Sequence, residues 1–324
     1  MHRQVTFITA GLLLAGCATN SHRTIGDFAS ELPQEWTISS ESNSRMPTFW
    51  WHSFRDARLN ETIGQALTSN PDIWSAAARL EAAWEQAKIA GAEQLPQIGL
   101  NGGLSISQLN MAQFGVNFPN MPISFTSERH NLTLGAQWEL DLWGRIRAGK
   151  RVARANALGQ AAEYAGARQS LASQVAKAWM LAIEARQQTR LAQFAISTHR
   201  TTVAQVQDRF DQGILPSQEL HLAKANLAGA EAQAAELESI ASRSIRQLEI
   251  LIGQIPSNKM DIPTELPQMP QAIPTGVPAQ ILSRRPDLVS AEQRLFAAGA
   301  TLDQAKATLY PQISLTASGG TSTG

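Results

Sequence analysis

The sequence predicts an α+β membrane protein in which a β-hairpin leads directly into very long helices. Three observations support this fold class. Residues 131–142 alternate polar and apolar side chains over about the length that a tilted strand needs to cross a bilayer. Residues 145–210 keep helical spacing without a proline, which corresponds to a helix of about 100 Å. Residues 67–100 are similar, without a gap, to residues 282–315, which indicates an internal duplication.

Composition and charge exclude several function classes. The chain has 324 residues, with 27 Lys and Arg against 27 Asp and Glu, so its net charge of zero argues against a nucleic-acid binder. Its single cysteine, Cys17, permits no intrachain disulfide and no thiol-based metal site. The six histidines lack metal-ligand spacing, and no nucleophile elbow, phosphate loop or zinc motif occurs. We therefore expect no catalytic residue, cofactor or metal site.

The N-terminus reads as an export signal followed by a lipid anchor. Residues 1–16 combine a basic start with a short apolar run and are predicted to be a signal peptide. The run ends in LLAGC, which resembles a bacterial lipoprotein box with cleavage before Cys17 and acylation of that residue. In that resemblance, Ala18 implies sorting to the outer membrane. The polar residues 17–48 are expected to form a lipidated tether.

The predicted elements follow in order along residues 49–256. A helical pattern from 56 to 93 is interrupted where Asn70 caps a new helix that begins with Pro71. A β-hairpin is expected within 96–142, with a loop-like segment over 109–130, and each strand has one apolar and one polar face. A long helix over 145–210, a return helix over 217–252, a proline-rich linker over 257–278 and a further segment over 279–324 complete the chain.

The end of the second strand and the start of the long helix form a predicted junction with the sequence QWELDLWGRIR. The candidate site residues of this strand–helix junction are Trp138, Asp141, Trp143 and Gly144. The two tryptophans suit either an interfacial belt at the rim of a barrel or packing against the adjoining helices. Glu139 and Asp141 share a polar face, which favours the lining of a lumen over an acid/base pair.

A second predicted site is the turn between the two long helices, within RFDQGILPSQEL. Gly213 suits a helix C-terminus and a backbone hinge, and Pro216 cannot continue the helix. Ser217 is expected to cap the return helix. With Arg209 and Phe210, these residues define a tip turn.

The duplication predicts that residues 279–324 begin a second copy of the unit. The two copies share Pro71 with Pro286 and Arg79 with Arg294, among other identities. The second copy enters its strand at Ile313 and ends at Gly324, so we expect the chain to be cut off within its second repeat.

Taken together, LAGC, ELDLWGRIR, RFDQGILPSQEL, LIGQIPS and IPTGVPAQILSRRPDLVSAEQRL resemble the outer-membrane-factor (TolC-like) family, and within it the NodT-type lipoproteins of RND efflux systems. The resemblance covers residues 17–324. It implies a homotrimer with a shared 12-stranded outer-membrane β-barrel, continued by an α-helical coiled-coil tunnel across the periplasm. It also implies that the tip turn docks on a periplasmic adaptor linked to an inner-membrane RND-type pump.

Three functional hypotheses follow. The first is the outer-membrane channel of a tripartite efflux system, which gives drugs or other small molecules a passive exit and performs no catalysis. The second is an anchored coiled-coil scaffold lipoprotein that does not conduct because its second repeat is cut short. The third, a secreted lipoprotein enzyme, is disfavoured because no candidate site is present. Expected partners are further copies of the chain, the adaptor, the pump and outer-membrane lipid, without nucleic acid.

Overall fold

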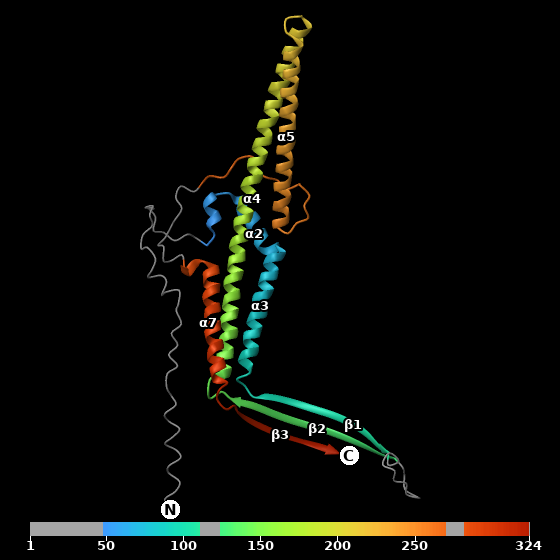
Figure 1. Cartoon of the computed structure of the whole chain (residues 1–324), viewed down its shortest axis with the longest axis vertical. Coiled ribbons are helices and arrows are strands. Elements are labelled where there is room, and N and C mark those ends of the chain that lie inside the picture. The colour runs from blue at the N-terminus through green and yellow to red at the C-terminus, as the bar shows by residue number, and fades with distance from the viewer. Residues whose placement is uncertain (1–47, 111–123, 270–281, 324) are drawn as a thin grey trace, which may run out of the picture.

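The structure, a computed structural model, describes residues 48–110, 124–269 and 282–323. Its dominant element is α4 (Arg145–Asp211), a helix of 67 residues and about 100 Å that spans the helical part in Figure 1. α5 (Ser217–Leu251) lies along the upper half of α4, whereas α3 (Pro71–Ala92) and α7 (Pro286–Ala307) flank its lower half. The other elements are η1 (Trp50–Phe54), α2 (Ala57–Ser69), β1 (Gln97–Asn110), β2 (Ser124–Leu140) and β3 (Ile313–Thr323).

Local sequence explains the break between α2 and α3. The side chain of Asn70 accepts hydrogen bonds from the backbone N–H groups of Asp72 and Ile73, at 2.8 and 3.3 Å. Pro71 occupies the first helical position, where its missing N–H is not needed. The Asn70 amide also donates to the carbonyl oxygen of Leu251 at 3.0 Å, which ties this helix start to the end of α5.

The duplication is visible in three dimensions. α3 and α7 each contain 22 residues and begin with the equivalent residues Pro71 and Pro286. They pack on the two sides of α4 in its lower half, so one long helix is shared by both copies (Figure 1). A Cβ added to Gly149, Gly159 or Gly166 of α4 would meet side chains of α7. Glycine therefore permits α7 to approach α4 closely.

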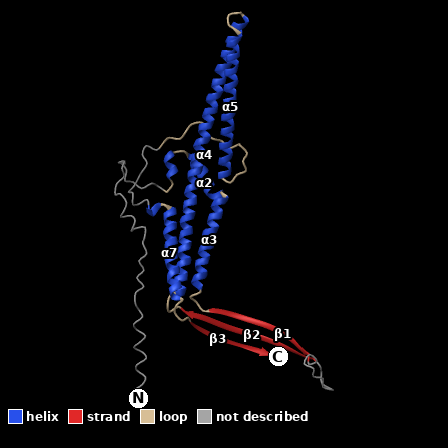
Figure 2. Cartoon of the chain, in the orientation of Figure 1, coloured by secondary structure: helices blue, strands red, loops and turns tan. Residues whose placement is uncertain are grey.

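The strands form one antiparallel sheet in the order β1-β2-β3, at one end of the helices (Figure 2). The register pairs Leu100 with Leu134, and Trp138 with Leu315. β1 runs to Asn110 and β2 begins at Ser124, so the strands extend into the segment expected to be a loop over 109–130. Backbone pairing extends the strands there, because residues 127–131 are polar and carry no alternating pattern.

The hydrophobic core lies at the waist of the molecule, where α2, α4 and α5 meet. Trp179, Ile183 and Leu248 are fully buried there, together with Leu59 and Ile63 of α2. Away from the waist, the long helices carry mainly alanine on their contact faces, which allows close helix approach without a thick core.

Within the described residues, no helix is both long and apolar enough to cross a membrane.

Candidate functional site

The start of α4 is capped by a residue outside the helix. Asp141 accepts hydrogen bonds from the backbone N–H groups of Ile146 and Arg147, at 3.1 and 2.8 Å, and forms an ion pair with the Arg147 side chain at 3.2 Å. The N-cap residue Gly144 has no side chain and takes a left-handed conformation with φ of 79°. The chain therefore turns sharply at Gly144 and places Asp141 over the positive end of the helix.

The electrostatics of Asp141 agree with this capping role. Burial alone would raise the pKa of the Asp141 carboxyl, but the hydrogen bonds from Arg147 and Ile146 and the charge of Arg147 lower it overall. The neighbouring Glu139 accepts two hydrogen bonds from Arg145, at 3.0 and 2.7 Å. Each carboxylate thus pairs with a different arginine, Glu139 with Arg145 and Asp141 with Arg147. The two ion pairs hold the end of β2 against the start of α4.

The two junction tryptophans reach the ends of the two repeated helices. The indole N–H of Trp138 donates to the carbonyl oxygen of Gln94, just after α3, at 3.0 Å. The indole N–H of Trp143 donates to the carbonyl oxygen of Pro311, just after α7, at 2.9 Å. Trp143 also stacks on Tyr310, with ring centroids 4.8 Å apart. Both tryptophans therefore pack against the adjoining chain, while Trp143 stays 50% exposed.

One face of the sheet is apolar and open to the surroundings. The antiparallel register places most apolar residues of the three strands on the same face, because directly paired residues point to the same side, whereas Leu109 lies on the opposite face. Nine of them are 37% to 73% exposed, far above the exposed fractions of core residues. The exposed members are Ile98, Leu100, Leu104, Ile106, Leu132, Leu134, Trp138, Ile313 and Leu315. Such a surface is typical of strands that face lipid.

The tip turn closes α4 with a Schellman motif. The N–H of Ile214 donates to the carbonyl oxygen of Arg209, and that of Gly213 to Phe210, both at 2.9 Å. Gly213 has φ of 72° and open space around its Cα, so it is needed for backbone conformation. Ile214 is 64% exposed at this end.

The prediction that Ser217 caps α5 is wrong. Ser217 is the first helical residue, and the N-cap is Pro216, which has an extended backbone and no side-chain acceptor. Pro216 starts the helix through its restricted φ of −74°, and the N–H of Glu219 donates to its carbonyl oxygen at 3.2 Å.

Sequence reasoning missed a buried carboxylate at the waist. Glu249, 1% exposed near the end of α5, accepts five hydrogen bonds from the loop over 257–260. Burial alone would raise its pKa, but the N–H groups of Asn258 and Lys259, with the hydroxyl and N–H of Ser257, lower it to about 2. Ser257 and Asn258, just after α5, are residue types that build turns whose N–H groups bind anions, but nothing in the sequence near Glu249 identifies it as the bound carboxylate.

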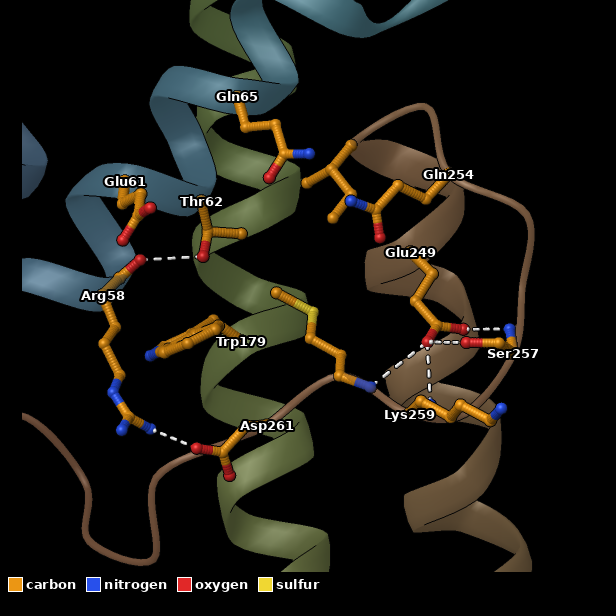
Figure 3. A pocket seen from close by; sticks show the side chains of 12 residues that line it. Arg58, Glu61, Thr62, Gln65, Trp179, Glu249, Gln254, Ser257, Lys259 and Asp261 are labelled. Atoms are coloured by element: carbon orange, nitrogen blue, oxygen red, sulfur yellow. Dashed lines mark hydrogen bonds and ion pairs between the residues drawn. The ribbon is translucent and has the colours of Figure 1, made fainter.

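Around Glu249 lies a shallow polar cleft, shown in Figure 3. Arg58 forms an ion pair with Asp261 at 2.9 Å across its mouth. Trp179 at its floor donates to the α2 cap residue Asp56 at 2.9 Å. These contacts join the loop after α5 to α5 and to α2, and the start of α2 to α4, so the cleft is a structural joint.

Cys17 lies outside the described residues, so its predicted lipidation has no structural counterpart.

The outer membrane efflux protein family model matches residues 62–254 and 277–324, well over half of the chain. The chain therefore belongs to the outer membrane efflux protein family. Its fold agrees, because the structure resembles that of the outer membrane protein VceC from Vibrio cholerae, with a TM-score of 0.68 and 26% identity. That match covers 88% of this chain and 66% of VceC.

Two curated relatives are named as outer membrane proteins. The pyoverdine export outer membrane protein OpmQ of Pseudomonas aeruginosa is 26% identical over 319 residues, which cover 98% of this chain and 67% of OpmQ. The probable outer membrane lipoprotein SilC of Salmonella typhimurium is 26% identical over 317 residues, covering 95% of this chain and 66% of SilC. The chain thus spans about two thirds of the length of these relatives, and its class is that of outer-membrane efflux channel proteins.

Proposed function

We propose that the protein is the outer-membrane exit duct of a tripartite efflux system, through which drugs or other small molecules leave passively. The observation that carries this proposal is the connection of one sheet with an exposed apolar face to one helix of 67 residues. The sheet provides a surface for lipid, and the helix is long enough to extend far into the periplasm.

The assembly follows from the same features. Both edges of the sheet, β1 and β3, are unpaired among the described residues, and strand edges in a bilayer require partners. We propose that copies of the protein meet at these edges in a homotrimer with a 12-stranded barrel, which takes four strands from each copy, one more than the three that the structure describes. Acylated Cys17 anchors each copy in the outer membrane.

The partners are proposed from the position of the tip turn. Gly213 and Ile214 lie at the end of the α4–α5 hairpin farthest from the sheet (Figure 1), where a periplasmic adaptor of an RND-type pump would meet them. The exposed side chain of Ile214 provides an apolar contact there.

The test is complementation of a strain that lacks its own exit duct. Production of the protein should restore drug resistance and yield a detergent-stable trimer in outer-membrane fractions. A soluble monomer without restored resistance would contradict the proposal. A Gly213→Pro variant, which disrupts the tip turn, serves as the matched control and should reach the membrane but restore no resistance.

A further inference from the structure

The polar face of the sheet is almost free of charge. In the register, odd-numbered residues of β1 and β2 share this face with even-numbered residues of β3, because directly paired residues point to the same side. Among the side chains that the structure describes on it, only Arg129 and Glu139 are ionisable. The others belong to serine, threonine, asparagine, glutamine and one leucine, with glycine between them. Two residues therefore decide the charge of this face.

Glu139, at the end of β2 next to the helices, has its charge compensated. Its carboxylate accepts two hydrogen bonds from the guanidinium of Arg145, at 3.0 and 2.7 Å, and each side chain is less than a quarter exposed. Opposite charges held this closely cancel each other at a distance. Glu139 therefore contributes little to the electrostatic field over the open part of the face.

Arg129, towards the other end of β2, has no such compensation. It is exposed and forms no hydrogen bond or ion pair within the described part of the chain. The adjacent carboxylate, Glu128, lies on the apolar face, and residues 111–123, which connect β1 to β2, include no acidic residue. Ser105, which pairs with Arg129 across the strands, is uncharged. Arg129 therefore presents an uncompensated positive charge on the polar face.

The sheet places this charge at the depth of its apolar band. Leu104 and Ile106, the neighbours of Ser105 in β1, point to the apolar face, and each is 63% exposed. Arg129 thus lies behind a part of the wall that faces lipid in the proposed barrel. Ionisable side chains at such a depth almost always point into a water-filled cavity, and they mark the paths of ions or substrates.

The side chain of Arg129 is also longer than those around it, so its charge reaches farther from the wall. Its neighbours on the polar face have short side chains or none: Gly103, Ser105, Ser107, Ser127 and Asn131. Glu139 is ten positions away along β2, which corresponds to about 33 Å. Because the Debye length is only about 10 Å at 0.1 M salt, Glu139 does not weaken the field of Arg129.

We infer that Arg129 is a charge-selecting residue of the duct, which attracts anions to the polar face and favours the exit of small molecules that carry a carboxylate or phosphate group. The inference rests on the proposed function, in which three copies line one lumen with this face. Three guanidinium groups then form a ring, and rings of arginine or lysine favour anions in pores. Walls of low dielectric constant strengthen such a field and raise the local concentration of the opposite charge.

Thiol reactivity measures this field directly. Ser105→Cys, in the full chain in its outer membrane, places a thiol opposite Arg129. It reacts with two methanethiosulfonate reagents of similar size, one with a sulfonate and one with a trimethylammonium group, and the chain without this substitution gives the background from Cys17. The ratio of the two rates reports the local preference for anions, and any effect of Arg129 on the thiol itself cancels in it. Arg129→Gln should lower the ratio by about threefold, and Arg129→Lys should keep it.

Glu128→Gln is the matched control, because it changes the charge of the adjacent residue on the other face of the same strand. It should leave the ratio unchanged. An unchanged ratio in Arg129→Gln, or a change of equal size in Glu128→Gln, would overturn the inference.

Ion selectivity in planar lipid bilayers separates this inference from the proposed function. In a gradient of potassium chloride, Arg129→Gln should lower the ratio of chloride to potassium permeability by about threefold. A protein that conducts without this change would overturn the inference and leave the duct intact. A parent protein that passes no current would contradict the duct, whereas the thiol ratio requires no current and still decides whether Arg129 attracts anions.

Discussion

Replacing Glu249 with glutamine is expected to release the loop that follows α5. The carboxylate accepts its five hydrogen bonds at 2.5 to 3.3 Å, from Ser257, Asn258, Lys259 and Met260. A glutamine amide turns an NH₂ group towards donors that the carboxylate satisfies, and buried donors without an acceptor are costly. The pKa lowering from 4.5 to about 2 corresponds to roughly 3 kcal/mol that favours the ionised, loop-bound state.

The sign of the pH dependence follows from the direction of this shift. Because the pKa of Glu249 in the folded protein lies below its ordinary value of 4.5, the stabilisation is fully present above that pH. It is lost as the pH falls towards 2, where the folded-state carboxyl takes up a proton. The loop should therefore open in strong acid even in the unmodified protein.

Trypsin provides the assay, because Lys259 lies within the clamped loop. A loss of about 3 kcal/mol raises the population of the open loop by about 100-fold, and cleavage after Lys259 should accelerate to match when opening is fast. Glu236→Gln, an exposed position on the same helix, is the control and should leave the rate unchanged. A cleavage rate in Glu249→Gln within threefold of that of the parent protein would refute the role of Glu249 in holding the loop over 257–260.

Three further changes probe the junction and the tip. Asp141→Asn should lower stability by about 1 kcal/mol through a weaker α4 cap, seen as faster hydrogen exchange at residues 145–148; unchanged exchange would contradict the cap. Gly213→Ala should cost about 1 kcal/mol because of its positive φ, measured by exchange at the tip. Trp143→Phe should keep the stacking on Tyr310 but free the Pro311 carbonyl, with faster exchange confined to the start of β3; a change throughout β1 would oppose this assignment.

Local patterns predicted the elements well where one chemical signal dominates. The pair Asn70 and Pro71 specifies a cap and a first helical residue, and both take these positions. The helix end at Gly213 follows from its left-handed conformation, which glycine adopts at little cost. The alternating faces of the strands also predicted the sheet's two surfaces, because period two assigns every side chain to one side.

Other features depend on contacts between distant residues and leave no local trace. The hydrogen bonds of Trp138 and Trp143 join residues 44 and 168 positions apart, so the sequence left belt and packing roles open. Glu249 looks like any charged helix residue, and only the position of the loop over 257–260 shows why it is buried. Ser217 was misjudged because a preceding proline can start a helix without a side-chain cap.

Because the helices of both internal repeats, α3 and α7, pack on the single helix α4, the order in which the chain folds matters. The contacts of α4 with α7, such as Glu163 with Ser290, join residues 127 positions apart, whereas Trp138 and Gln94 are much closer in sequence. Closing the longer loop costs more entropy, so we expect α3, β1, β2 and α4 to associate first. During synthesis the glycine-lined side of α4 then stays uncovered until α7 has been made. The α7 helix of a neighbouring nascent chain can bind at the same place. Exchange of α7 between two protein chains is therefore the form of misassembly that we expect most for this architecture.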